Sequence, residues 1–495
     1  MRRAAGHLAR GVLEVTGGGY GRRVVIVVGK GNNGGDGWAA APLLAKAGAQ
    51  VTVVSLHDLD VLASPATSAA RSAWQALPGS RVQVGIEQLV GVLAECDVVV
   101  DCMLGTGARG APSGDVAQAV VLLNNCGRPI VACDVPTGVD ADFGKVPAAA
   151  VHATLTVTFG ALKRGLLLHP AAQHVGRLVV GDLGPRYPIS ASGWSALTAA
   201  GACESLPAVD AEKRSRGVAL AIAGAQGTAG AAALCAKGLQ AGGAGLVTVA
   251  VPQPIQATVA GMVPAAMTRS LPHELGVVGE EAVEVLADAD RFDAVVAGPG
   301  MQPTNGTRAV IDHLRASAAR LVLDADALNV YRDDPEVLGE HVGALVITPH
   351  ERELARISGR HDVAEDRARI AVDLAGRLDC TVVAKGPRTV VAAADGRVWV
   401  TPVGGPGLAT GGTGDVLAGL VAAAIATTDD VALAVARAVW LHGLSGDLAG
   451  RGRAKRLVAD EFAHSIPSVL AQMGKIARTR AAWPFDHGND PWDAL

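Results

Sequence analysis

Residues 23–37 of this 495-residue chain have the sequence RVVIVVGKGNNGGDG, which determines how the first part of the chain folds. The first six residues of this stretch form an apolar run, which is typical of a parallel strand covered on both faces. Five of the nine residues after the run are glycine, and we expect a helix to begin near Trp38. A strand, a glycine-rich turn and a helix start place unpaired N–H groups around an anion. The pattern predicts an anion- or nucleotide-binding loop, with a sharp turn of small residues as the alternative.

Apolar runs of this kind alternate with Ala/Leu-rich helical stretches along the whole chain, which is typical of α/β domains built on parallel sheets. The other expected strands are 50–55, 97–102, 129–134, 218–223, 244–251, 293–297, 320–324, 344–348 and 380–384. Proline, serine and charged residues break the pattern at 188–212, where we expect a linker. We therefore predict two α/β domains, at 1–187 and 213–480, and a tail at 481–495.

The composition excludes several functional classes. Basic and acidic residues nearly balance, 43 against 47, and aromatic residues make up only 3% of the chain. A nucleic-acid binder that relies on a basic face or on base stacking is therefore not expected. No apolar run approaches the ~20 residues of a membrane span, and the seven cysteines form no CxxC pair. We expect a cytoplasmic protein with reduced thiols and no membrane partner.

Polar residues follow two more of the expected strands in the first domain. Asp101 is followed by a glycine-rich loop at 104–110, and Asp134 is followed by Thr137. The carboxyl ends of parallel strands meet at one edge of a sheet, where ligands bind. Oxygens of Asn33, Asp101 and Thr137 could thus hold a monovalent or divalent cation. Asp134 is the best candidate for a general acid/base, although an aspartate at a strand end is often only a helix cap.

Together these motifs resemble the epimerase domain of NAD(P)H-hydrate repair enzymes. The resemblance rests on four patterns in order: GNNGGDG at 31–37, DxxxGTGxxG at 101–110, DxPTGxD at 134–140 and TFGALKRG at 158–165. It implies a Rossmann-like parallel sheet. Family members usually carry a longer helical lead before the first strand, so we expect a shortened amino terminus here.

The resemblance also implies roles for individual residues. A potassium ion would be held by Asn33, Asp101 and Thr137. Proton transfer or substrate contact would come from Asp134 and Lys163, although Lys163 alone would be taken for a solvated surface lysine. The damaged cofactor would be held by Asn32, Asn33, Gly34, Gly35, Asp36, Gly105, Thr106, Gly107, Ala108, Arg109, Gly110 and Ala111.

A denser glycine motif lies in the second domain, Gly404-Gly405-Pro406-Gly407-Leu408-Ala409-Thr410-Gly411-Gly412-Thr413-Gly414-Asp415, ahead of an apolar helix expected at 416–426. Gly414 lets the backbone approach a phosphate, and successive N–H groups at the helix start form an anion hole. Asp415 can accept a proton from a hydroxyl placed over that hole. Positioning and a base are what phosphoryl transfer requires. The alternative is a structural glycine turn capped by aspartate.

Four other loops follow strands of the second domain: Gly298-Pro299-Gly300, Asp324-Ala325-Asp326, Thr348-Pro349-His350 and Lys385-Gly386-Pro387-Arg388-Thr389. We expect the first to allow close approach of a ligand and the last to meet the phosphates or sugar of a nucleotide. The acidic loop could organise a magnesium–water shell. A histidine such as His350 is more often an ordinary loop residue, and we interpret Cys380 and His442 as structural.

GxPGxATGGTGD, with KGxxT, TPHxxE and DADALN, resembles the ribokinase-like fold and, more narrowly, the nucleotide-dependent NAD(P)H-hydrate dehydratases. The resemblance now covers nearly the whole chain. It implies a ribokinase-like α/β/α domain that uses ADP with Mg²⁺, with Asp415 as the base. The nucleotide would be bound by Lys385, Gly386, Pro387, Arg388, Thr389, Thr410, Gly411, Gly412, Thr413 and Gly414, and the damaged cofactor by Gly243, Gly300 and His350. A homo-oligomer is also expected.

The implied reaction repairs hydrated nicotinamide cofactors. The first domain would interconvert the R and S hydrates of NADH or NADPH. The second would phosphorylate and dehydrate the S form, releasing AMP and phosphate. Two alternatives stay open: a ribokinase-like small-molecule kinase joined to a nucleotide-binding regulator, and a first domain that is a non-catalytic sensor or partner-binding module. A kinase would accumulate a phosphorylated product, whereas the repair reaction releases free phosphate.

Overall fold

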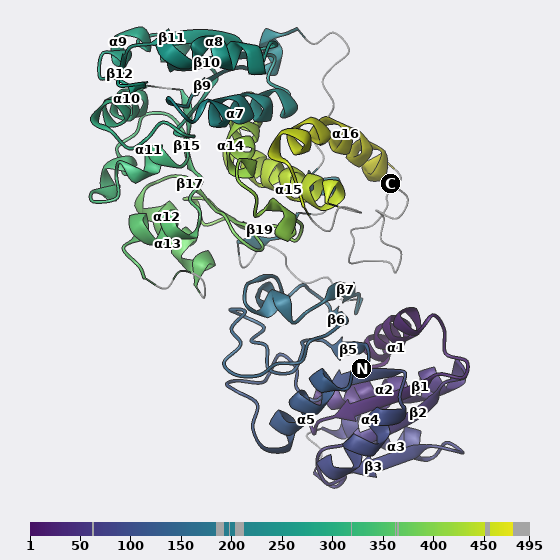
Figure 1. The fold of residues 1–495 in the computed structure, drawn as a ribbon. Helices are drawn as coiled ribbons and strands as arrows, with labels where there is room; N and C mark the ends of the chain where they lie inside the picture. Colours follow the sequence, from purple (N-terminus) through teal and green to yellow (C-terminus); the bar gives the residue numbers. More distant parts are fainter. Residues whose placement is uncertain are drawn as a thin grey trace. The chain divides into compact units, whose positions relative to one another are not determined.

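The computed structural model describes residues 1–61, 64–184, 193–197, 199–202, 212–317, 319–361, 363, 366–450 and 456–478. The chain divides between Ala191 and Ser192 into two compact units, drawn in Figure 1 from purple to blue and from teal to yellow. Most of the expected linker, 188–212, lies outside the described residues. Its described part contains β8 (Trp194–Ser195) and α6 (Ala199–Ala202), which belong to the second unit.

The first unit is built on a seven-stranded sheet in the order β3-β2-β1-β4-β5-β6-β7, and every neighbouring pair is parallel. The carboxyl ends of its strands therefore meet at one edge of the sheet, as the sequence predicts. The strands are β1 (Arg23–Val28), β2 (Gln50–Ser55), β3 (Arg81–Val84), β4 (Val98–Cys102), β5 (Ile130–Cys133), β6 (Leu155–Phe159) and β7 (Arg177–Gly181).

Helices cover both faces of this sheet, which explains why its central strands are apolar throughout. Val24, Ile26 and Val28 of β1 pack with the first three helices, and Val25 and Val27 pack on the opposite face with the other two. The helices are α1 (Arg2–Thr16), α2 (Asn32–Lys46), α3 (Pro65–Gln75), α4 (Leu89–Glu95) and α5 (Gly114–Asn125).

Helix α2 begins at Asn32, six residues before the expected start near Trp38. The prediction was wrong because all five glycines were taken for a loop, whereas Gly34, Gly35 and Gly37 lie in the first two turns of the helix. A Cβ atom on Gly34 would lie 2.0 Å from the carbonyl oxygen of Gly29, and one on Gly37 would lie 2.9 Å from Cys102 Cβ. The glycines thus let α2 lie directly against the ends of β1 and β4.

The second unit contains a ten-stranded mixed sheet in the order β11-β10-β9-β14-β15-β16-β17-β18-β19-β8. The strands from β11 to β17 are parallel, and β18 is antiparallel to both of its neighbours. The strands are β9 (Val218–Ile222), β10 (Leu246–Pro252), β11 (Met267–Leu271), β14 (Ala294–Ala297), β15 (Arg320–Leu323), β16 (Leu345–Ile347), β17 (Thr381–Ala384), β18 (Val390–Ala392) and β19 (Val398–Val400). A separate hairpin consists of β12 (His273–Glu274) and β13 (Val277–Val278).

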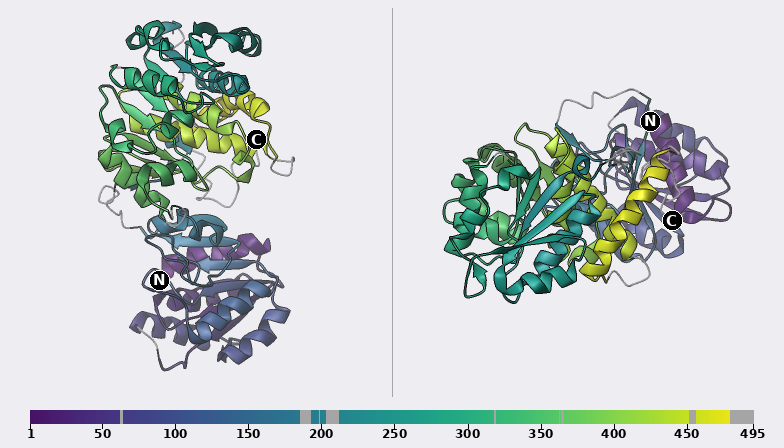
Figure 2. Two further views of the ribbon diagram at one scale, coloured as in Figure 1. Left: turned by 60° about the vertical axis from the view of Figure 1, so that its left-hand side comes forward. Right: turned by 90° about the horizontal axis from the view of Figure 1, so that it is seen from above.

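Helices lie on both sides of this sheet, the yellow group on one side and green ones on the other (Figure 2, right). They are α7 (Ala229–Ala241), α8 (Gln256–Met262), α9 (Ala282–Val285), α10 (Asn305–Arg315), α11 (Asp326–Asn329), α12 (Glu351–Ser358), α13 (Arg367–Arg377), α14 (Thr413–Ile425), α15 (Val431–Ala449) and α16 (Ala459–Arg478). Helix α14 begins three residues before the expected 416, so Thr413 and Gly414 belong to its first turn. Among the described residues, no helix has the length and apolar character needed to cross a membrane.

Candidate active sites

A chain of hydrogen bonds joins three strand-end loops of the first unit. Asn33 Nδ2 donates to the carbonyl oxygen of Leu104 at 2.8 Å, and Leu104 N donates to Thr137 Oγ1 at 3.1 Å. The Thr137 hydroxyl and backbone N–H then donate to the two oxygens of Asp101, at 2.7 and 2.8 Å. The structure thus brings together the three side chains that the sequence grouped as cation ligands.

Asp101 is a buried carboxylate with no exposed surface, and no ion pair is formed with it in the described part of the chain. Burial raises the pKa of Asp101 to about 6, although hydrogen bonds from Thr137 and Met103 act in the opposite direction. A buried anion is costly unless a cation compensates it. The oxygens of Asp101, Asn33 and Thr137 are hard ligands that suit an alkali-metal ion.

Asp134 and Lys163, which the sequence proposes as the reactive pair, are in direct contact. Lys163 Nζ lies 2.7 Å from Asp134 Oδ1 and also donates to the carbonyl oxygen of Phe159 at 2.7 Å. Thr158 Oγ1 donates to the same carboxylate oxygen at 3.1 Å. Asp134 has a φ of 65°, a left-handed conformation that its short polar side chain tolerates. The carboxylate is therefore held at a fixed place at the end of β5.

Asp36 lies on α2, three residues after Asn33, and is the third carboxylate of this region. Burial raises the pKa of Asp36 to about 7, while the chain's amino group lowers it and Asp134 raises it further. The preceding residues are supported from behind by the start of α3, because Ser64 Oγ donates to Asn32 Oδ1 at 2.9 Å. Ser64 escaped sequence reasoning, and the only signal for it was its position before the proline that opens α3.

The loop that contains residues 105–111 forms the rim of the site. Together with residues 135–140 it lines a cavity of about 200 Å³ that also includes Lys145. Arg109, on this loop, is exposed and reaches Asp142 at 3.3 Å. Basic side chains at this rim suit the phosphates of a dinucleotide.

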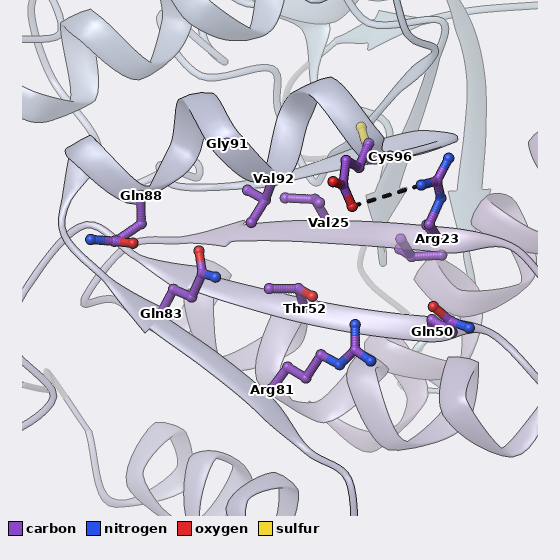
Figure 3. A pocket seen from close by; sticks show the side chains of 12 residues that line it. Arg23, Val25, Gln50, Thr52, Arg81, Gln83, Gln88, Gly91, Val92 and Cys96 are labelled. Atoms are coloured by element: carbon purple, nitrogen blue, oxygen red, sulfur yellow. Dashed lines mark ion pairs between the residues drawn. The ribbon is translucent and has the colours of Figure 1, made fainter.

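A larger cavity in the first unit, about 330 Å³, has no part in this site (Figure 3). It is lined by the first residues of three strands, Arg23, Gln50 and Arg81, and so lies away from their carboxyl ends. Its lining is polar, and part of its positive charge is neutralised, because Arg23 forms an ion pair with Glu95 at 3.8 Å.

In the second unit, the loops after β15, β16 and β17 and the start of α14 meet around the largely buried side chain of Lys385. Lys385 Nζ lies 2.7 Å from Asp324 Oδ1. A Cβ atom built on Gly414 would lie 3.6 Å from the same ammonium. The Lys385 loop, the acidic loop after β15 and the first turn of α14 are therefore adjacent, as the sequence requires of a nucleotide site.

Asp415 lies in this first turn, and burial raises the pKa of Asp415 to about 7. The neighbouring Asp324 raises this pKa further and Lys385 lowers it. His350 caps the amino end of α12, since its Nδ1 accepts hydrogen bonds from the N–H groups of Arg352 and Glu353, at 3.1 and 3.3 Å. Burial lowers the pKa of His350, so the ring is neutral near pH 7 and its Nδ1 can act as this cap.

Asp447 is a residue of this region that sequence reasoning missed. It lies on α15, and its two oxygens accept hydrogen bonds from the N–H groups of Gly404 and Gly405, at 2.9 and 2.6 Å. Gly443 and Gly446, on the same helix, leave room for the loop, since Cβ atoms there would meet Val403 O at 2.8 Å and Leu408 Cγ at 2.5 Å. A single carboxylate on a helix face of small residues was the available signal.

Gly300 follows β14, at the same edge of the sheet as the other loops, and its carbonyl oxygen accepts a hydrogen bond from Thr228 Oγ1 at 2.7 Å. Gly243 does not lie at this edge. It lies between α7 and β10, at the amino end of the parallel strands, whereas the other loops lie at the carboxyl end. Its φ of 93° serves the turn into β10. His442 is buried, and its Nε2 lies 2.9 Å from the carbonyl oxygen of Thr413, which agrees with a structural role.

Comparison with known proteins assigns the two units to two different families. The family described as YjeF-related protein N-terminus matches residues 1–165, and the NAD(P)H-hydrate dehydratase family matches residues 219–468. A bifunctional NAD(P)H-hydrate repair enzyme of Moorella thermoacetica is 36% identical over 93% of this chain and 90% of its own. That of Thermanaerovibrio acidaminovorans is 37% identical over 92% and 91%. The ADP/ATP-dependent NAD(P)H-hydrate dehydratase of Bacillus subtilis, co-crystallized with ATP/Mg²⁺, matches 55% of this chain and 96% of its own, with 28% identity and a TM-score of 0.50.

Fold and sites define an α/β enzyme with two active sites, one in a Rossmann-like unit and one in a ribokinase-like unit. The chain belongs to the family of bifunctional NAD(P)H-hydrate repair enzymes. It combines the epimerisation of NAD(P)H hydrates with their nucleotide-dependent dehydration. Membership of this family favours the repair reaction over the alternatives of a simple kinase and of a non-catalytic first domain.

Proposed function

We propose that the dehydratase unit uses ADP as its phosphoryl donor, releases AMP and phosphate, and relies on Asp415 as the general base. The observation that carries this proposal is the position of Asp415 in the first turn of α14, beside the ammonium of Lys385. A carboxylate whose pKa is about 7 is matched to accept a proton near neutral pH. The free N–H groups of the same turn face the place where charge develops on the transferred group.

The proposed reaction has two stages, transfer of the phosphoryl group and loss of phosphate. Asp415 takes the proton of the ring hydroxyl, and the hydroxyl oxygen forms a bond to the transferred phosphorus. The bond from that phosphorus to the AMP oxygen breaks. The new C–O–P linkage then loses phosphate, because the ring nitrogen donates its electron pair to the carbon. Loss of a proton from the adjacent ring carbon restores the double bond of the dihydropyridine.

The loops on the two sides of Lys385 would hold the nucleotide, with adenine near 385–389 and 406–410. Magnesium would be held by phosphate oxygens and by Asp326, which forms no ion pair in the described part of the chain. When bound, Mg²⁺ would neutralise charge on the phosphates. Gly300 and His350 would contact the damaged cofactor on the opposite side of Asp415.

In the first unit, we propose that Asp134 and Lys163 exchange protons with the substrate. Inversion at the carbon that bears the hydroxyl would proceed by loss of the hydroxyl, expelled by the electron pair of the ring nitrogen, and by addition of water to the other face. A group must therefore protonate the departing hydroxyl and deprotonate the returning water. The 2.7 Å pair of an ammonium and a carboxylate supplies both functions. The buried Asp101 supports the proposal that K⁺ binds to Asn33, Asp101 and Thr137.

One assay tests both units. The full chain is incubated with mixed hydrate epimers and either ADP or ATP, while dihydropyridine absorbance and AMP are followed. Asp415→Asn should abolish AMP formation and leave ADP binding largely intact, and retained turnover would rule out Asp415 as the base. Asp134→Asn should stop recovery near half of the total, because only the S hydrate is consumed. Replacing K⁺ with Na⁺ should slow the R-to-S exchange alone.

The sequence-based predictions of a cytoplasmic location and of a homo-oligomer remain proposals. The six described cysteines are all free thiols, which supports a reducing compartment. Light scattering of the purified chain tests the oligomeric state. The second unit begins before the predicted residue 213, because β8 and α6, between residues 194 and 202, belong to it. The proposed end of the first domain at 187 and of the second at 480 stay proposals, which limited proteolysis tests.

A further inference from the structure

The dehydratase site contains a buried ion pair that phosphoryl transfer by Asp415 does not by itself explain. Asp324 follows β15 and Lys385 follows β17, so the lysine side chain passes the end of the intervening strand β16 to reach it. Nζ and Oδ1 are 2.7 Å apart, and the two side chains are only 18% and 2% exposed. The backbone of Lys385 is also held in place, because its N–H donates a hydrogen bond to the carbonyl oxygen of Pro349 at 2.9 Å.

The end of this side chain lies against the first turn of α14. The distance of 3.6 Å from Nζ to a Cβ built on Gly414 shows that no side chain separates the ammonium from the backbone of that turn. A helix amino terminus and a cation together form a stronger anion site than either alone. Gly414 and Lys385 therefore border the same space, and that space is next to Asp415.

The charges of three carboxylates act on the ammonium. Burial alone would lower the pKa of Lys385, but Asp324, Glu353 and Asp415 together raise it, so the lysine stays charged. Glu353 is itself held in place, because its Oε2 accepts a hydrogen bond from the N–H of His350 at 2.8 Å. Asp324 is the partner in direct contact, and its charge raises the pKa of Asp415 as well.

From these contacts we infer that Asp324 is a positioning residue of the dehydratase: it holds the Lys385 ammonium against the first turn of α14, where the transferred phosphoryl group binds. The inference rests on the proposed function of Asp415 and its neighbouring turn. It reassigns Asp324 from the magnesium shell that the sequence suggested, because its carboxylate is already neutralised by a lysine. A buried pair is weak evidence for stability alone, and this pair lies at the ligand-binding edge of the sheet.

Asp324→Asn in the full chain tests the inference, because asparagine keeps the shape and removes the charge. We expect kcat for dehydration of the S hydrate to fall roughly 10- to 100-fold, somewhat less than the loss of a direct oxyanion donor. KM for ADP should change less than about 3-fold, since the other nucleotide contacts remain. The acid limb of the pH profile should move to lower pH, because one negative charge no longer opposes ionisation of Asp415.

A double-mutant cycle with Lys385→Met isolates the route of the effect. If Asp324 acts through Lys385, Asp324→Asn should cost little further activity once the lysine is gone. Lys385→Arg should keep more of the kcat than Lys385→Met, since the charge survives. Asp288→Asn removes the carboxylate of another ion pair of the unit, with Arg269 at 2.6 Å, and should leave kcat unchanged.

Several outcomes would overturn the inference. An unchanged kcat and an unmoved acid limb would reduce the pair to a structural contact. Additive losses in the double variant, or a higher Mg²⁺ requirement in Asp324→Asn, would make Asp324 a magnesium ligand. Epimerase activity and the melting temperature of each variant report folding, and if Asp324→Asn fails to fold, the comparison of Lys385→Arg with Lys385→Met decides. Activity retained by Asp415→Asn would instead overturn the proposed base and leave the position of Lys385 to be judged by this cycle.

Discussion

The ammonium of Lys163 bridges the ends of two neighbouring strands, since it lies 2.7 Å from Asp134 Oδ1, after β5, and 2.7 Å from the carbonyl oxygen of Phe159, in β6. The side chain of a lysine in a loop is usually exposed to solvent. Here two acceptors fix its position, and its side chain is only 20% exposed. The cost of holding a flexible side chain in one place indicates a function beyond solubility.

Lys163→Met should slow the exchange of R and S hydrates by roughly 100-fold or more, the range of a lost general acid or base. The initial dehydration rate of pure S hydrate should not change, because it is catalysed by the other unit of the same chain. Lys46→Met, at the exposed end of α2, is the matched control and should leave both rates intact. Exchange that persists in Lys163→Met would remove the lysine from the reaction.

The pKa of Asp415, about 7, predicts the pH dependence of dehydration. A base must be deprotonated to act, so kcat/KM for the S hydrate should fall about tenfold per pH unit below pH 7 and level off above it. Initial rates between pH 5.5 and 9 measure this limb directly. A limb near pH 4 would show that the carboxylate ionises as it does in water.

The same pKa also predicts a stability effect. The unfolded chain releases this proton near pH 4, whereas the folded chain holds it to about 7. The contribution of the protonated carboxyl to stability is therefore fully present below about pH 4 and lost as the pH rises through 7. Asp415→Asn should thus unfold at a higher urea concentration than the native chain at pH 8 and at the same concentration at pH 4. A variant that is less stable at pH 8 would contradict the raised pKa.

Much of the fold could be predicted from the sequence, because its central strands are buried on both faces. Strands β1 and β2 begin and end at the predicted residues, and the other expected strands differ by one or two residues. The strands that escaped prediction include β3, which carries alternating polar residues at the edge of its sheet, and β7, the opposite edge strand. Edge strands lack the continuous apolar signal.

The candidate sites could be predicted as loops but not as contacts. Spacing placed Asn33, Asp101 and Thr137 at one edge of the sheet, and the structure joins them by hydrogen bonds. No pattern in the sequence could show that Lys385 forms an ion pair with Asp324. That contact depends on the strand order β15-β16-β17 and on the length of the lysine side chain. Gly243 was wrongly placed in the binding site, because a pair of glycines in the sequence does not show which end of a strand it adjoins.

The close contact of α7 with α14 gives a prediction with a control in the same helix. A Cβ atom on Gly238 would lie 2.2 Å from the carbonyl oxygen of Val416, which is backbone and cannot move aside, whereas one on Gly230 would meet nothing within 4 Å. Gly238→Ala should therefore lower the free energy of unfolding of the second unit by about 1–3 kcal/mol. Gly230→Ala should be neutral or stabilising by up to about 1 kcal/mol, because alanine is the better helix former. Urea denaturation followed by dehydratase activity measures both. Because α14 begins with the turn that contains Asp415, Gly238→Ala should also lower the kcat of dehydration while epimerisation continues. Equal stability of the two variants would contradict the prediction, because it would show that the helices can separate at no cost.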